Sequence, residues 1–390
     1  MARINGAADP ATALGQGFYV PSARDIASHI SARMDLQSTS THLVVGGVGS
    51  GKSTQLLVAR ERLREEHPGA IVLYLDLSKH VDLDKLEPGA LLASAGLALC
   101  DLAPVSSERN HFHASFQIWA HGNWLDELDV HLEHQAEVHE ALYEFRPGIV
   151  QPPSDRLQSE IEKHRDELRQ FIVKAFPDNE GVFLLIDSLD RMSNIDLFRK
   201  AVQQDVAAIA SAGIGLVLVG PLRALYGMER ELTERFDYLY RQPAVEALHN
   251  EHGARFLFEI LRKRAPVDIL PDPSCEKLVS ASGGVLRDLL RLAHQAGDEA
   301  YVDGSDTIEP VHVGRAVDAF GRTLMLGLTQ DDLDKLRELH STGRFVRVSP
   351  EDLALLVTRR ILDYQDDTGR LHYSVHPALA PLLDDHPGKV

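Results

Sequence analysis

Short apolar runs alternate with amphipathic stretches through the first 245 residues of the chain. The runs span residues 42–45, 71–77, 182–187, 215–219 and 238–241, and their composition is typical of strands. Apolar character is nearly continuous within them, as expected of strands that are covered on both faces. The alternation therefore predicts an α/β fold with a parallel sheet at its centre.

A long helical stretch, roughly residues 85–178, separates the second and third runs. It contains two apolar helical faces, one formed by Leu125, Leu128, Leu132, Ala136, His139 and Leu142, the other by Leu157, Ile161, Leu168 and Ile172. Prolines 147, 152 and 153 lie between these faces, so we predict a helical hairpin inserted into the α/β domain. Residues 106–180 hold 15 acids and 7 bases, a net charge of −8. This charge favours a protein contact or a scaffold element over a DNA clamp.

Beyond residue 245 the pattern becomes helical, with segments near 249–264, 274–281, 285–301 and 310–324. Two further helical leucine patterns and a hairpin, with strands at 361–364 and 371–375, follow a break at residues 329–330. We therefore predict an α/β core over 1–245, a helical domain over 246–325, and a small winged-helix-like module over 326–390.

The segment Gly46-Gly47-Val48-Gly49-Ser50-Gly51-Lys52-Ser53 lies between the first apolar run and a helical sequence. It fits the phosphate-binding pattern G-x-x-x-x-G-K-[ST]. Glycines let the backbone approach a phosphate closely, and the loop amides and the helix N-terminus attract an anion. We predict that these residues and Thr54 bind ATP, that Lys52 reaches the β- and γ-phosphates, and that Ser53 is a ligand of Mg²⁺. A plain turn between two core elements is the alternative.

The third apolar run ends in Asp187. In P-loop enzymes such an acid holds the Mg²⁺ shell, so we predict Asp187 as a metal ligand, with a helix-capping acid as the alternative. Many ATPases place a glutamate directly after this aspartate to polarise the attacking water, but this chain has Ser188. Asp190 is the next acid and the predicted base, with a structural N-cap as the alternative. Slow hydrolysis, suited to a switch, is the expected consequence.

Composition limits the partners. The chain has 58 acids and 40 bases, a net charge of −18, which gives no global support for nucleic-acid binding.

Cys100 and Cys275 are predicted to be buried thiols in a reducing compartment. No apolar run is long enough to span a bilayer and the N-terminus has no apolar signal segment, so a cytoplasmic protein is expected. His131 and His134 could bind a metal, but a packed or solvated helix face is favoured.

With these motifs in order, the chain resembles the AAA+/STAND superfamily of P-loop ATPases, with a lid similar to that of origin-recognition-complex-type initiators. The resemblance runs from about Tyr19 to Leu324 and more weakly to the end. It implies that Tyr19 and Val20 belong to the segment that packs around adenine. It also implies that Arg287, in Gly283-Gly-Val-Leu-Arg287, is the lid arginine that reaches the γ-phosphate.

Other family positions concern assembly and hydrolysis. Arg235 stands where the family supplies an arginine finger to a neighbouring subunit, with Arg230 as the second choice and a surface arginine as the alternative. The family carries a polar residue at the end of the fourth strand, where this chain has Gly220-Pro221. This departure, together with Ser188, places the resemblance nearer to switch-like branches than to processive motors.

The resemblance thus implies an ATP-dependent and Mg²⁺-dependent switch or assembly factor. We expect homo-oligomers, or a protein partner bound through the helical insertion or the C-terminal module. The resemblance also implies a place in a bacterial defence or signalling system. Two alternatives remain: a DNA-associated ATPase of the initiator or transposition-helper type, and an adaptor that holds its nucleotide without hydrolysing it.

Overall fold

The structure, a computed structural model, describes residues 10–22, 24–121, 157–347, 349–366 and 368–384. The chain divides into two compact units. One combines residues 1–25, 46–54 and 241–390, and the other combines residues 26–45 and 55–240. The three domains expected from the sequence, with boundaries at 245 and 325, stay a prediction.

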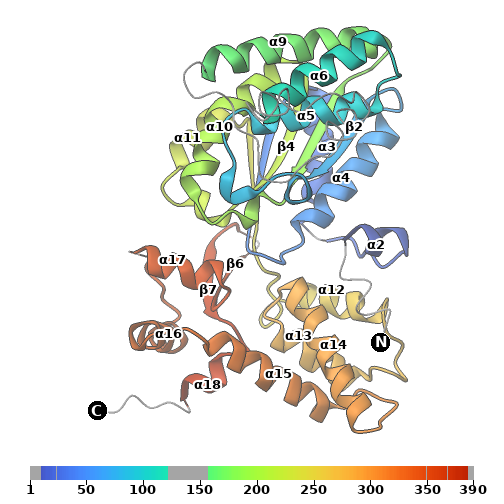
Figure 1. Ribbon diagram of the computed structural model, residues 1–390. Coiled ribbons are helices and arrows are strands. Elements are labelled where there is room, and N and C mark those ends of the chain that lie inside the picture. Colours follow the sequence, from blue (N-terminus) through green and yellow to red (C-terminus); the bar gives the residue numbers. More distant parts are fainter. Residues whose placement is uncertain (1–9, 23, 122–156, 348, 367, 385–390) are drawn as a thin grey trace, which may run out of the picture. The chain divides into compact units, whose positions relative to one another are not determined.

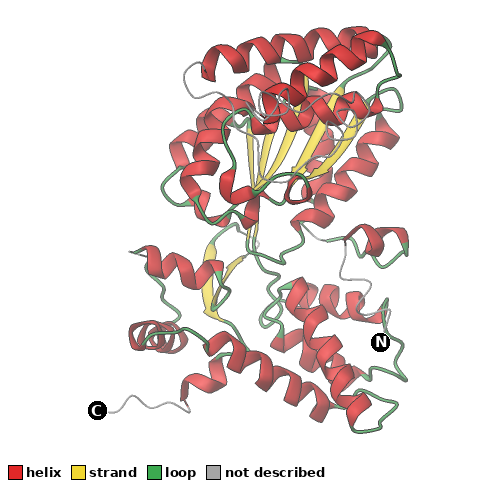
Figure 2. Cartoon of the chain, in the orientation of Figure 1, coloured by secondary structure: helices red, strands yellow, loops and turns green. Residues whose placement is uncertain are grey.

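A five-stranded sheet forms the centre of the second unit (Figure 2). Its strands are β1 (Thr41–Gly46), β2 (Ile71–Asp76), β3 (Val182–Asp187), β4 (Ile214–Gly220) and β5 (Tyr238–Gln242), in the order β2-β3-β4-β1-β5. β2 pairs in parallel with β3, β3 with β4, and β4 with β1. The expected strands and the α/β fold class are confirmed, and every residue of β1, β3 and β4 is buried.

Helices cover both faces of the sheet (Figure 1). One face packs against a core formed with α5 (Ala90–Leu102), α6 (Ser107–His121), α9 (Leu157–Ala175), α10 (Ile195–Ser211) and α11 (Glu229–Arg235). From β1 the chain passes β4 and β3 to reach β2 at the edge of the sheet, and from β2 onward it returns in the opposite direction through β3 and β4 to β5. Because such crossovers are right-handed, α4 (Lys52–Glu66) covers the other face, where it meets α3 (Ile26–Leu36) through Ala27 and Gln55.

The expected helical insertion is described only at its ends, in α5, α6 and α9. Phe112 of α6 stacks on Phe171 of α9 with ring centroids 4.0 Å apart, and Ile161 and Leu168 are buried as their helical spacing predicts. The apolar face from Leu125 to Leu142 and the pair His131 and His134 lie outside the described residues. Cys100 and Cys275 are buried thiols, as expected.

The first unit contains short α2 (Pro10–Gly15) and the helices α12 (Glu251–Arg262), α13 (Asp272–Ala281), α14 (Leu286–Val302) and α15 (Pro310–Met325). Its C-terminal part has α16 (Gln330–Thr342), α17 (Pro350–Val357), the antiparallel hairpin of β6 (Ile361–Gln365) and β7 (Leu371–Val375), and α18 (Ala380–Asp384). Capping boxes at Thr329 and Ser349 explain where α16 and α17 begin. The two helices and the hairpin are those predicted, while winged-helix-like character stays a prediction. None of the described helices is long and apolar enough to cross a bilayer.

Candidate functional site

The glycine-rich loop joins the end of β1 at Gly46 to the start of α4 at Lys52. Gly49 and Gly51 have φ angles of +86° and +97°, a conformation that L side chains rarely adopt. A Cβ atom at Gly49 would lie 2.6 Å from Cβ of Arg287, and one at Gly51 would lie 2.9 Å from Leu286. Glycine is therefore required at both positions by backbone conformation and by space.

Hydrogen bonds fix the direction of the loop peptides. Lys52 is 3% exposed, and its ammonium donates to the carbonyls of Gly46 at 3.0 Å and Gly47 at 2.8 Å. The next three carbonyls, those of Val48, Gly49 and Ser50, accept from the Arg359 side chain, the Arg287 amide and the Gln242 side chain, each at 3.3 Å. Because a trans peptide holds its C=O and N–H on opposite sides, the donors at Val48 and Ser50 turn the amides of Gly49 and Gly51 to the other side of the loop.

This loop fits the phosphate chain of a nucleotide. Successive loop amides around left-handed glycines form the kind of concavity that binds anions. The loop runs into the first turn of α4, where Ser53 and Thr54 are partly exposed and where the helix N-terminus adds positive potential. Lys52 supplies a buried positive charge, and the Ser53 hydroxyl is an oxygen ligand of the kind Mg²⁺ prefers.

The lid turn lies directly against this loop within the same unit. Arg287 is the second residue of α14, its amide contacts Gly49, and its side chain is exposed. Upstream, the segment with Tyr19 and Val20 is held at the end of α12. Lys263 donates to the Tyr19 carbonyl at 2.8 Å, and Val20 is buried. The unit thus contains the loop, Arg287 and the segment predicted to pack around adenine, and it places Arg287 against the loop.

Asp187 ends β3 in the other unit and is 3% exposed. Its Oδ2 accepts from the Tyr74 hydroxyl at 2.6 Å, and its Oδ1 accepts from the Ser188 amide at 2.7 Å. Burial and the nearby Asp187 carboxylate raise the pKa of Tyr74 well above its usual value, so this hydroxyl keeps its proton. Asp187 therefore has a fixed donor at each oxygen.

Sequence reasoning missed Asp76, the register partner of Asp187 on β2. Oδ1 of Asp76 accepts from the Ser188 hydroxyl at 2.5 Å and from the Ser78 hydroxyl at 2.7 Å. Burial disfavours its charged form, but these hydrogen bonds and the charge of Lys79 lower the pKa of Asp76 below its usual value. The only hint in the sequence was that the second apolar run, like the third, contains an acid near its end.

Ser188 occupies the position where a glutamate was expected, and its φ of 78° lies in the left-handed region. Asp190 is half-buried in the short 3-10 turn Leu189–Arg191. The N-cap of the following helix α10 is Asn194, whose side chain accepts from the Asp196 amide. Neither Asp187 nor Asp190 caps that helix, so the capping alternative for the two acids is wrong.

Arg235 is exposed at the end of α11, three residues before β5 begins. Asp237, beside it, accepts from the Thr41 amide at 2.8 Å, where β1 begins. Arg235 therefore lies at the amino edge of the sheet, whereas the glycine-rich loop leaves β1 at the carboxyl edge. It also lines a hollow of about 280 Å³ with side chains of α9 and α10. The second choice, Arg230, forms an exposed ion pair with Glu234 at 2.7 Å.

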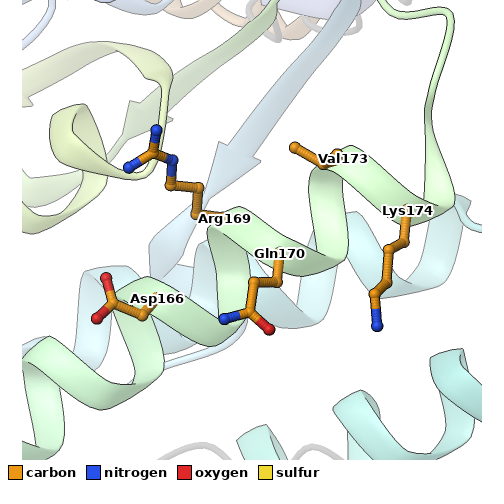
Figure 3. A pocket seen from close by; sticks show the side chains of 5 residues that line it. All are labelled: Asp166, Arg169, Gln170, Val173 and Lys174. Atoms are coloured by element: carbon orange, nitrogen blue, oxygen red, sulfur yellow. The ribbon is translucent and has the colours of Figure 1, made fainter.

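A larger hollow of about 400 Å³ runs along the surface of α9 (Figure 3). Among the residues that the structure describes, those lining it come from this one helix: Asp166, Arg169, Gln170, Val173 and Lys174. None of them belongs to the predicted nucleotide site, and side chains of both charges line it. The nucleotide site predicted from the sequence therefore does not coincide with this hollow.

Solved structures with a similar fold include the Aeropyrum pernix ORC2 protein (ADPNP-ADP complexes). It is 13% identical to this chain, with 94% of both chains covered and a TM-score of 0.47. The Aeropyrum pernix ORC1 protein in complex with DNA is 16% identical, with 95% of this chain and 94% of that chain covered and a TM-score of 0.43. The Thermotoga maritima RuvB Holliday junction branch migration motor is 14% identical, with 92% of both chains covered and a TM-score of 0.42. These likenesses concern the fold alone. No protein-family model and no curated protein matches the sequence.

Proposed function

We propose that this chain binds ATP with Mg²⁺, hydrolyses it slowly, and acts as a nucleotide-controlled switch or assembly factor. The observation that carries the proposal is the loop itself. Two left-handed glycines, a buried lysine and donors at successive carbonyls form a cradle for phosphates at the start of a helix. A plain turn would need neither the buried ammonium nor the fixed peptide directions.

Each residue has a distinct role in this proposal. The loop amides from Gly46 to Gly51 and the Lys52 ammonium bind the phosphates, and Arg287 adds a guanidinium from the lid. Ser53 and Asp187 hold Mg²⁺, which neutralises phosphate charge when it is bound. Tyr19 and Val20 contact the base.

Hydrolysis is proposed to be slow because Ser188 replaces the usual glutamate and cannot act as a carboxylate base. Two carboxylates are candidates for the base: Asp190, which the sequence indicated, and Asp76, which accepts a hydrogen bond from the Ser188 hydroxyl. The exposed Arg235, at the opposite sheet edge, suits contact with a second copy better than contact with the nucleotide of its own chain. This supports an oligomer controlled by nucleotide, as in the switch-like STAND proteins. The charge of −18 does not favour DNA as the partner.

Calorimetry with ATP, ADP and a slowly hydrolysed analogue, together with native mass measurement, tests the proposal. Lys52→Ala should weaken ATP binding roughly 10- to 100-fold, because a charge-assisted contact contributes about 1.5–3 kcal/mol. Lys163→Ala is the matched control, since Lys163 is an exposed lysine of α9 whose ion pair with Glu167 is 3.9 Å long. Nucleotide should change the mass of the wild type and leave that of Lys52→Ala unchanged. Absence of heat with any nucleotide would reject the function, and equal masses in all conditions would reject the switch.

A further inference from the structure

Arg359 connects the C-terminal module to the phosphate-binding loop. It lies in the turn between α17 and β6, where one nitrogen of its guanidinium donates to the Val48 carbonyl at 3.3 Å. Its φ is 61°, and within the described residues only Ser188 shares such a left-handed angle without being glycine. A left-handed backbone at a residue with a long side chain costs energy, of order 1 kcal/mol or more, and persists where surrounding contacts hold it.

The other end of this contact is Asp288 of the lid. Arg359 Nε lies 3.1 Å from Asp288 Oδ2, and Asp288 is fully buried in the first turn of α14, next to Arg287. His376 Nε2 lies 3.6 Å from the same oxygen and is also fully buried. A buried carboxylate needs an opposite charge, because desolvation of an unpaired one is costly. The Arg359 guanidinium provides it.

The C-terminal hairpin also packs against the lid turn independently of Arg359. The Tyr364 hydroxyl donates to the Gly283 carbonyl at 2.9 Å. Leu362 and Tyr364 form a small buried cluster with Ala244 and Val285. The module is therefore docked by apolar contacts, and Arg359 is the polar link that extends from it to the loop.

We propose that Arg359 is a positioning residue that couples the C-terminal module to nucleotide binding, by holding the Val48 carbonyl of the loop and Asp288 of the lid at once. The inference rests on the proposed function. Its physical basis is the peptide between Val48 and Gly49. A donor on the carbonyl side holds the Gly49 amide toward the opposite side, where the phosphates are proposed to bind. Movement of the module would release this peptide and loosen the cradle.

The variants separate positioning from folding. Arg359→Lys keeps a positive charge opposite Asp288 but replaces the fork with a single ammonium, which cannot span both partners. Arg359→Gly removes the side chain at a position whose φ suits glycine, so the relief of backbone strain offsets part of the cost of leaving Asp288 without its opposite charge. Arg360→Ala is the matched control, because Arg360 donates to the carbonyls of Leu324 and Leu326 and not to the loop.

The measurements are the dissociation constants of ATP and ADP by calorimetry and the hydrogen exchange of residues 359–376 with and without nucleotide. We expect both Arg359 variants to bind about tenfold more weakly, a loss of roughly 1.4 kcal/mol, and to lose the nucleotide-dependent protection of 359–376. Arg360→Ala should bind within about twofold of the wild type. Folded Arg359 variants with wild-type affinity and protection would overturn the coupling while leaving nucleotide binding intact. Absence of binding by the wild type would overturn the proposed function and the coupling together.

Discussion

The hydroxyl of Tyr74 on β2 donates a 2.6 Å hydrogen bond to Oδ2 of Asp187 on β3. The two residues are 113 positions apart in the chain and meet because β2 and β3 are adjacent parallel strands. This bond fixes the orientation of the carboxylate that we propose as a ligand of Mg²⁺. Tyr74 therefore acts on the site through Asp187.

Removing that hydroxyl should lower stability and metal-dependent binding together. Tyr74→Phe deletes a hydrogen bond to a charged group and leaves Asp187 without one donor, so we expect a loss of about 1.5–3 kcal/mol in the free energy of unfolding. ATP binding should weaken in the presence of Mg²⁺ and change little in its absence. Denaturant unfolding and calorimetry with and without Mg²⁺ measure the two effects. Tyr301→Phe, at an exposed position, is the control, and equal weakening in both conditions would contradict a role through the metal.

Two carboxylates compete for the role of base in the proposed hydrolysis. Asp76 accepts a hydrogen bond from Ser188, the residue directly after Asp187. We therefore expect Asp76→Asn to lower the rate of phosphate release about 100-fold, which is within the usual range for loss of a general base. Asp190→Asn should lower it less than about tenfold. Single-turnover assays with saturating ATP measure both, and the reverse order would assign the base to Asp190.

Stability should depend on pH through Asp205 of α10. This side chain is fully buried and accepts from the amides of Gly89 at 2.6 Å and Leu91 at 2.8 Å, at the start of α5. Burial raises the pKa of Asp205 to about 7 despite these hydrogen bonds. A raised pKa means that the folded state holds the proton more tightly than the unfolded state. The resulting stabilisation is complete below about pH 4 and is lost as the pH rises to 7.

Asp205→Asn tests this dependence, because the amide has no proton to lose in this range. The difference in unfolding free energy between wild type and variant should fall by up to about 4 kcal/mol between pH 4 and pH 7. Using this difference cancels the contribution of His42. Burial lowers the pKa of His42 to about 4, and its effect on stability has the opposite slope. Denaturant titrations at several pH values give the difference, and a value independent of pH would contradict a protonated Asp205.

Local pattern was sufficient to predict much of this chain. The strand, the glycine-rich loop and the helix follow one another in consecutive residues, so residues 46–54 could be predicted as a phosphate-binding loop without knowledge of packing. The same holds for Asp187, because an acid after a buried strand marks the strand's carboxyl end. Helix and hairpin patterns predicted the elements of residues 246–384 because hydrophobic periodicity reports which face of an element is covered.

Only the tertiary structure decided which distant residues meet. Strand register brought Asp76 and Tyr74 to Asp187, and a one-residue shift would have turned these side chains to the other face. Packing of the hairpin on the lid placed Arg359 between Val48 and Asp288, a contact that joins residues 311 positions apart. Contacts between such distant residues produce no periodic pattern in the sequence. The conformational preference of each segment is independent of the other segment until the chain folds.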